Sequence, residues 1–423
     1  MLPLAWRRRL ANSQIRAFLA ILGPGIIAAS AGNDAGGVLT YSQAGAYYEY
    51  RLLWVLFFLT FSLAIAQEMG ARMAAVTGKG LADLIREEFG VKTTVFAMVA
   101  LIIANISTTV AEFAGIVAVA EMFLPDTARF IVVPAIAIGI WLLVVRGTYR
   151  RIERIFLMMC AVYLAYVVAA FAAHPPWADI LRQTVVPDFS KSRPDGQYVL
   201  MVIALVGTTV APWMQFYVQS SVRDKGISTK DYPLERIDVL SGAILSNLIS
   251  FFMVVTCAAT LFARHIRLDT AENLAKALGF LGAGGNYLFA LGLFNAAMVG
   301  AVAVPLSTAY AVTEALGWES GLGRRIREAP LFIGVYSMVI VIATAVILFS
   351  RTSPLGVILI SQVINGMLLP VILVLMLRLI NKPRLMGEHT NSRFYNVVAG
   401  TTVVLVTALS VAYLGLQIRE MFA

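Results

Sequence analysis

Long apolar segments separated by short polar connections make up most of the chain. A transmembrane helix needs about 20 apolar residues, and eleven segments meet this requirement: 18–47, 52–76, 93–120, 128–146, 153–173, 197–222, 235–263, 286–315, 330–349, 354–380 and 395–417. A further segment, 267–280, has the amphipathic pattern of a short surface helix. The pattern therefore predicts an all-α polytopic membrane protein with no appended soluble domain.

Two of these spans are interrupted near their middle. The first contains GNDAGG at Gly32–Gly37, and the sixth contains GTTVAPW at Gly207–Trp213. Glycine pairs let a backbone leave the helical conformation, and Pro212 removes a backbone donor inside the sixth span. Either interruption alone could be an ordinary helix kink. Two at matching positions favour a binding site, because broken helices at corresponding places in two halves form the substrate sites of many transporters.

The positions of the breaks divide the chain into two sets of five spans. We expect one repeat over about 18–173, a second over about 197–380, and an extra helix at about 395–417. All three parts belong to a single transmembrane domain, residues 1–423. Helices 1 and 6 are then the ones broken at mid-membrane.

Composition and charge agree with this prediction. Hydrophobic residues make up 59% of the chain and charged residues only 13%, whereas about a quarter of a soluble domain is charged. Most Lys and Arg residues fall in the connections that share one side when the N-terminus is cytoplasmic. The positive-inside rule then predicts a cytoplasmic N-terminus and an extracytoplasmic C-terminus in a cell (inner) membrane. The net charge of +9 therefore does not indicate a nucleic-acid partner, and no obligate protein partner is evident.

Asp34 is the lone carboxylate of the first break. A carboxylate near the bilayer centre costs several kcal/mol and usually marks an ion or substrate path. A structural ion pair is the alternative, but the spans contain almost no Lys or Arg at mid-depth. A broken helix also frees backbone carbonyl oxygens, and carboxylate plus carbonyl oxygen is the ligand set of a hard cation. The residues thus indicate a cation site with Asp34 as its one charged ligand.

Other polar residues in the spans have structural interpretations beside functional ones. Glu68 lies one helical turn before Arg72, which favours a structural pair. Glu112 is either a protonated or inter-helix hydrogen-bonded acid, or part of the transport path. No catalytic or phosphate-binding motif and no zinc spacing occur, the three histidines lie outside the spans, and both cysteines lie in apolar runs. We therefore expect no enzyme activity and no cofactor.

Several longer stretches resemble the natural resistance-associated macrophage protein (NRAMP) family of divalent-metal transporters, and specifically its magnesium-transporting branch. The resemblance rests on Gly23–Trp54, Gln67–Gly90, Thr108–Gly115, Gly207–Ser221 and Ser361–Val363. It implies a LeuT-type fold, an inverted five-plus-five helix repeat with an eleventh transmembrane helix, in agreement with the span pattern. It also implies divalent metal ions as the partners besides the lipid bilayer.

The chain departs from the family pattern at the expected metal site. The family's Asp-Pro-Gly-Asn becomes Asp34-Ala-Gly-Gly37, which keeps the acid and loses the amide. Its Met-Pro-His becomes Ala211-Pro-Trp213, which loses the sulfur and the imidazole. The resemblance implies a metal site formed by Asp34, Gly37, Ala211 and the carbonyls of Ala31 and Thr208. From their placement near the breaks we also expect four polar residues close to the ion or its waters: Asn33, Gln215, Gln362 and Asn365.

The family's proton route is also altered. A second family histidine corresponds to Val218 and an aspartate to Thr109, while a glutamate is kept as Glu112. Together with Trp213 these are the changed proton-route positions that the resemblance implies. Fewer titratable groups argue against proton coupling. Uptake does not need it, because two charges moving through roughly 100 mV gain about 4.6 kcal/mol.

These departures predict the transported ion. A thioether favours Mn²⁺ or Fe²⁺ over Mg²⁺, whereas Mg²⁺ keeps several waters and few carboxylates. Ala211 and a wider site at Gly37 therefore suit a partly hydrated Mg²⁺, and Mn²⁺ as a second substrate, imported by alternating access. The alternatives are a proton-coupled Mn²⁺/Fe²⁺ transporter, a sodium-coupled organic-solute symporter of the same fold, and a sensor with an inactive site.

Overall fold

The structure is a computed structural model that describes residues 31–146, 164–187, 196–266, 268, 270–276, 283–321 and 327–421. In this part of the chain, nine helices are long and apolar enough to cross a membrane. They match nine of the eleven predicted spans. The first and fifth predicted spans lie partly outside the described residues.

The described part of the chain is helical throughout its regular structure. Its α-helices are α3 (Ala35–Tyr48), α4 (Leu53–Thr77), α5 (Leu81–Glu121), α6 (Arg129–Arg146), α8 (Leu164–Ala172), α9 (Trp177–Val185), α10 (Gly196–Thr209), α11 (Pro212–Asp224), α12 (Tyr232–Thr260), α13 (Ala271–Ala275), α14 (Ala283–Leu316), α15 (Pro330–Phe349), α16 (Pro354–Ile380), α17 (Pro383–Met386) and α18 (Arg393–Met421). A 3₁₀ turn, η1 (Ala31–Asn33), precedes α3.

Two short helices differ from the sequence prediction. The surface helix expected at 267–280 has Ala271–Ala275 as its described α-helical part. The helix α9 was not predicted, because its nine residues are too few to register as a span. It is strongly amphipathic, with Ile180 buried and the charged Asp179 and Arg182 exposed.

Both predicted helix breaks are present. In the first, η1 ends at Asn33, and Asp34 adopts an extended conformation before α3 begins. In the second, α10 ends at Thr209, and the extended Ala211 precedes α11. Pro212 occupies the first turn of α11, where its missing N–H costs nothing because that position has no helical partner. In the second break the local sequence thus ends one helix and starts the next after two intervening residues.

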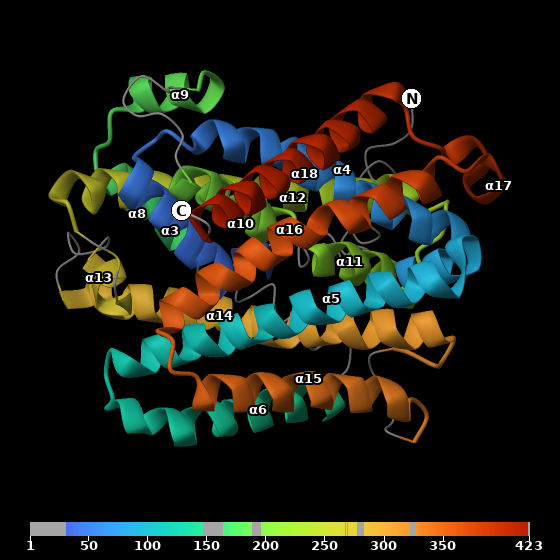
Figure 1. The fold of residues 1–423 in the computed structure, drawn as a ribbon, viewed down its shortest axis with the longest axis horizontal. Coiled ribbons are helices and arrows are strands. Elements are labelled where there is room, and N and C mark those ends of the chain that lie inside the picture. The colour runs from blue at the N-terminus through green and yellow to red at the C-terminus, as the bar shows by residue number, and fades with distance from the viewer. Residues whose placement is uncertain are drawn as a thin grey trace, which may run out of the picture.

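The broken helices lie inside the molecule and other helices face outward. In the most apolar 18-residue stretch of Gly196–Asp224, which contains α10 and α11, 89% is buried inside the protein. In the corresponding stretch of Asp126–Arg146, which contains α6, only 22% is buried. The long helices α5, α14 and α16 pack across the centre, and α3 packs against α12 and α10. Figure 1 shows α6 and α15 side by side along one edge, next to α5 and α14. The candidate site is therefore enclosed, and α6 and α15 form a peripheral layer.

Candidate metal-ion site

The two helix breaks lie against each other. A Cβ atom placed on Gly32 would lie 3.7 Å from the carbonyl oxygen of Thr208, in the second break. The hydroxyl of Tyr41, in α3, forms a 3.0 Å hydrogen bond with Oγ1 of Thr209. The structure thus brings the two interruptions together, although their first residues, Gly32 and Gly207, are 175 positions apart in the sequence.

Asp34 is buried at the start of α3, with 3% of its surface exposed. Its Oδ1 accepts the backbone N–H of Gly37 at 2.7 Å, so the side chain caps the helix. A Cβ atom on Gly36 would lie 3.0 Å from Asp34 Oδ1 and would collide with the amide nitrogen of Gln362. The missing side chain at Gly36 therefore lets the Asp34 carboxylate and the Gln362 amide approach each other. Within the described residues Asp34 forms no ion pair with Lys or Arg.

Glu112 in α5 is the second carboxyl group of the site. It is fully buried, and its Oε2 accepts the backbone N–H of Ala35 at 3.1 Å. Its carboxyl group is a direct neighbour of the Asp34 carboxyl group. Oε1 of Glu112 has no hydrogen-bond partner in the described part of the chain. The hydrogen bond between Glu112 and Ala35 agrees with one of the two interpretations of Glu112 that the sequence left open. The contact with Asp34 places a second carboxyl group beside the expected metal ligand.

Several buried acceptor atoms near the breaks also lack partners among the described residues. They are Thr208 Oγ1, Gln215 Oε1 and Asn365 Oδ1. The donors of two of these side chains are engaged, since Asn365 Nδ2 donates to Thr108 Oγ1 at 2.8 Å and Gln215 Nε2 donates to the Ala211 carbonyl at 3.4 Å. An unsatisfied buried polar atom costs about 1–3 kcal/mol. Two donor groups of the same region, Gln362 Nε2 beside Gly36 and Trp213 Nε1 in the second break, also lack a described partner. This arrangement suits a guest such as water, which both donates and accepts hydrogen bonds.

Asn33 lies in the first break but turns away from this group. Its Nδ2 donates to the backbone oxygen and the Oγ of Ser246, at 3.2 and 3.0 Å. Its Oδ1 accepts the Ser250 hydroxyl at 2.8 Å. Both polar atoms of Asn33 are therefore committed to α12, and the side chain anchors the break.

The space next to Gly37 differs from the expectation. A Cβ atom on Gly37 would collide with the carbonyl oxygen of Gly32. Loss of the family's Asn therefore leaves no open room at position 37, because the backbone of the preceding turn fills it. Ala211 is buried and extended directly before α11, and η1 begins at Ala31.

Three of the four altered proton-route positions, Thr109, Trp213 and Val218, are filled by groups that do not titrate near neutral pH. Thr109 Oγ1 donates to the Asn105 carbonyl at 2.7 Å, one turn back in α5. Trp213 is fully buried against Tyr217. Val218 is also fully buried, and its Cγ1 lies 3.1 Å from where a Cβ on Gly70 would be.

Met214 is a site residue that the sequence analysis missed. Its sulfur lies 3.7 Å from the Cβ position of Gly32, so a thioether contacts the first break although Ala211 has none. Gln67 Nε2 approaches the same sulfur at 4.0 Å. Met214 lies in the first turn of α11, directly after the second break, and this closeness to the break in the sequence could have indicated it.

Glu68 has the structural role that the sequence favoured. Its Oε2 pairs with Arg72 at 3.1 Å, and Tyr232 donates a hydrogen bond to its other oxygen. Arg72 also donates to the backbone oxygens of His389 and Thr390, at 2.9 and 3.1 Å. This pair joins α4, α12 and the connection before α18.

Comparison with known proteins gives a consistent family and fold. A sequence model described as "Natural resistance-associated macrophage protein-like" matches residues 25–415. "Divalent metal cation transporter MntH" of Bacillus subtilis (strain 168) is 25% identical over 406 residues, covering 94% of this chain and 92% of that protein. The protein with the same name in Verminephrobacter eiseniae (strain EF01-2) is 27% identical over 411 residues, covering 93% and 88%.

Solved structures confirm the fold. A manganese transporter of Eremococcus coleocola superposes with a TM-score of 0.79 at 17% identity, covering 96% of this chain and 88% of that one. Mhp1, a nucleobase-cation-symport-1 family transporter, superposes with a TM-score of 0.56 at 13% identity, covering 93% and 92%. The LeuT-type architecture expected from the sequence is thereby confirmed.

Proposed function

The chain belongs to the natural resistance-associated macrophage protein-like family, and from this premise we propose that it carries divalent metal ions across the cell membrane. Its relatives in Bacillus subtilis and Verminephrobacter eiseniae are named divalent metal cation transporters. The buried Asp34 between two broken helices supports the same function here, because a carboxylate and freed carbonyls are ligands for hard cations. This role involves no enzymatic step.

Magnesium is the ion we propose as the main substrate. The observation that carries this proposal is a set of buried polar atoms without partners in the described part of the chain: the acceptors Gln215 Oε1, Asn365 Oδ1 and Glu112 Oε1, the Thr208 hydroxyl, and the donor Gln362 Nε2. Mg²⁺ releases its waters reluctantly, and each retained water offers hydrogen-bond donors. Acceptors around a single direct carboxylate ligand therefore suit a partly hydrated Mg²⁺. Ala211 supplies no thioether to favour a softer ion.

We further propose that transport needs no proton. Thr109, Trp213 and Val218 replace titratable groups of the family pattern with side chains that carry no exchangeable charge near neutral pH. The membrane potential is a sufficient driving force, since about 4.6 kcal/mol for two charges through roughly 100 mV corresponds to about a thousandfold accumulation.

Proton-coupled Mn²⁺ transport is the second candidate, and two observations favour it. The Met214 thioether contacts the first break, which returns a soft ligand atom to this region. The neighbouring carboxyl groups of Asp34 and Glu112 form a pair in which one group can hold a proton while the other is charged.

Flux measurements with the purified protein in vesicles distinguish the two candidates. Internal dyes report Mg²⁺, Mn²⁺ and pH in parallel, with an inside-negative potential set by potassium and valinomycin. We expect saturable Mg²⁺ entry that increases with the potential, without acidification. Protein-free vesicles and the Asp34→Asn variant are the controls. Mn²⁺ entry with acidification and without Mg²⁺ entry would overturn the magnesium proposal in favour of the second candidate.

A further inference from the structure

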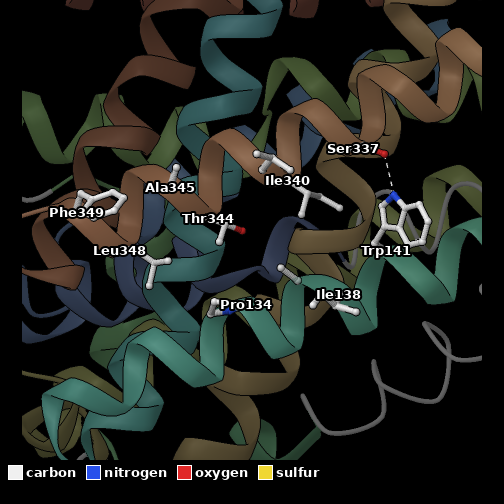
Figure 2. A pocket seen from close by; sticks show the side chains of 11 residues that line it. Pro134, Ile138, Trp141, Ser337, Ile340, Thr344, Ala345, Leu348 and Phe349 are labelled. Carbon is white, nitrogen blue, oxygen red and sulfur yellow. Dashed lines mark hydrogen bonds between the residues drawn. The ribbon is translucent and has the colours of Figure 1, made fainter.

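The peripheral helices α6 and α15 enclose a groove of about 470 Å³. Figure 2 shows Ile138 and Trp141 of α6 on one side, and Ala345, Leu348 and Phe349 of α15 on the other. The groove is distant in the fold from the two helix breaks, which α5 and α14 separate from this layer. The ion site therefore does not account for it.

The lining of the groove offers almost no polar atom to a ligand. The indole N–H of Trp141 donates to Ser337 Oγ at 2.7 Å, and Ser337 Oγ donates to the Ile333 carbonyl at 2.7 Å. The polar groups of Trp141 and Ser337 are therefore already hydrogen-bonded within the protein. Thr344 contributes a single hydroxyl without a described partner, and no charged residue lines the groove. A polar ligand would lose its hydration without replacement, so the occupant is apolar.

The groove opens toward the hydrocarbon of the bilayer. Ile138, Val341 and Phe349 line it and are 59%, 65% and 80% exposed. They belong to helices that are long and apolar enough to span the membrane, so the exposed surface meets lipid chains. The bilayer is consequently the source of the occupant.

The length of the groove matches one half of the bilayer. Its lining on α15 runs from Ser337 to Phe349, which at 1.5 Å per residue is about 18 Å. Half of the hydrocarbon core is about 15 Å thick. The whole helix has 20 residues, so the groove occupies the leaflet that contains its C-terminal end. An extended acyl chain entering from that end would fit along it.

A basic side chain lies just beyond this end. Arg351 follows Phe349 by two residues and is exposed. Within the described residues its guanidinium group makes no hydrogen bond or ion pair. A guanidinium group at the polar edge of either leaflet attracts the phosphate of an anionic head group by direct charge–charge interaction. We propose that the groove binds one acyl chain of an anionic phospholipid whose phosphate lies next to Arg351.

Native mass spectrometry of the full-length protein tests whether a lipid is retained. Purified protein is incubated with an equimolar mixture of phosphatidylglycerol and phosphatidylcholine before detergent exchange. We expect one retained phospholipid, with phosphatidylglycerol preferred several-fold because its net negative charge lies next to Arg351. Ala345→Phe fills the groove and should abolish retention. Val346→Phe adds the same bulk to an exposed position of α15 outside the groove and should not. Arg351→Gln should remove the preference and keep the lipid.

Fluorescence quenching in vesicles locates the chain. Brominated acyl chains quench nearby tryptophan, and the difference between the wild type and Trp141→Phe isolates the Trp141 signal. We expect brominated phosphatidylglycerol to quench Trp141 at a lower mole fraction than brominated phosphatidylcholine, and Ala345→Phe to remove this difference. Equal quenching by both lipids in the wild type would overturn the proposal. So would a dimer in the mass spectrum that Ala345→Phe dissociates, because a second copy would then cover the groove.

Discussion

Glu112 accepts the backbone N–H of Ala35 at 3.1 Å, although the two residues are 77 positions apart in the sequence. Ala35 is the first residue of α3, and Asp34 caps the same helix by accepting the Gly37 N–H at 2.7 Å. Two carboxyl groups from different helices thus satisfy one helix N-terminus inside the protein. The partial positive charge of that terminus stabilises negative charge, which allows two acids to share a buried site.

Asp34→Asn should remove transport while keeping the fold. The Asn side chain is an equally good helix cap, so the N–H of Gly37 keeps its acceptor, but the ion loses its one direct carboxylate ligand. We expect the rate of Mg²⁺ entry into vesicles to fall to that of protein-free vesicles, and the melting temperature in detergent to change little. Transport at the wild-type rate by Asp34→Asn would mean that the ion binds elsewhere.

Substitutions at Glu112 should separate its structural role from a role in proton transfer. Glu112→Ala leaves the buried N–H of Ala35 without an acceptor, which should cost about 1–3 kcal/mol of stability. Glu112→Gln keeps an acceptor oxygen and should melt near the wild type. Without proton coupling, Glu112→Gln should also retain potential-driven Mg²⁺ entry. Loss of flux in this stable variant would show that Glu112 has a direct part in transport.

Met214 and Ala211 should shift ion preference in opposite directions. Met214→Ala removes the thioether beside Gly32, so Mn²⁺ entry should decrease several-fold relative to Mg²⁺ entry. Ala211→Met adds a thioether at the second break and should increase Mn²⁺ entry relative to Mg²⁺ entry. Competition between the two ions in vesicles measures the ratio, with Met253→Ala, a buried methionine of α12, as the matched control. Identical ratios in all variants would exclude sulfur from ion selection.

An amide at position 37 is a poor test of selectivity. Gly37→Asn places a Cβ against the Gly32 carbonyl oxygen, so it should deform the first break. We expect a lower melting temperature and loss of flux for every ion. A Gly37→Asn variant that melts like the wild type would show that the break has room for a side chain after all.

Gly207→Ala should disturb the contact between α10 and α16. A Cβ atom there would collide with the backbone oxygen of Gln362, and overpacking of this kind costs about 1–3 kcal/mol. Gly334→Ala is the control, because a Cβ on Gly334 meets no atom within 4 Å. Thermal unfolding in detergent should show a loss of stability for Gly207→Ala and none for Gly334→Ala. Equal melting temperatures would indicate that α10 can shift away from α16.

The spans and their two breaks were predictable because hydropathy and backbone chemistry are local properties. Glycine and proline weaken a helix at the position where they stand, and the structure has extended residues at Asp34 and Ala211, within the two predicted interruptions. Asp34 also stood out locally, as an acid in an apolar segment. The architecture was therefore predictable from the sequence, and Asp34 remains the predicted centre of the site.

Contacts between distant segments were not predictable in the same way. The approach of Met214 to Gly32 and of Glu112 to Ala35 depends on how separate helices rotate and settle against each other. The filled space at Gly37 depends on the path of the backbone through the first break. The absence of a side chain at Gly37 therefore does not make the site wider, because the backbone of Gly32 occupies that space.

The hydrogen bonds of Asn33 have a mechanical consequence. All three join it to a single turn of α12, at Ser246 and Ser250, and Asn33 is covalently bonded to Asp34. No flexible connection intervenes between α12 and the carboxylate. While these bonds hold, Asn33 and the turn of α12 at Ser246 and Ser250 keep a fixed distance, so any displacement of that turn would also displace the backbone that carries Asp34.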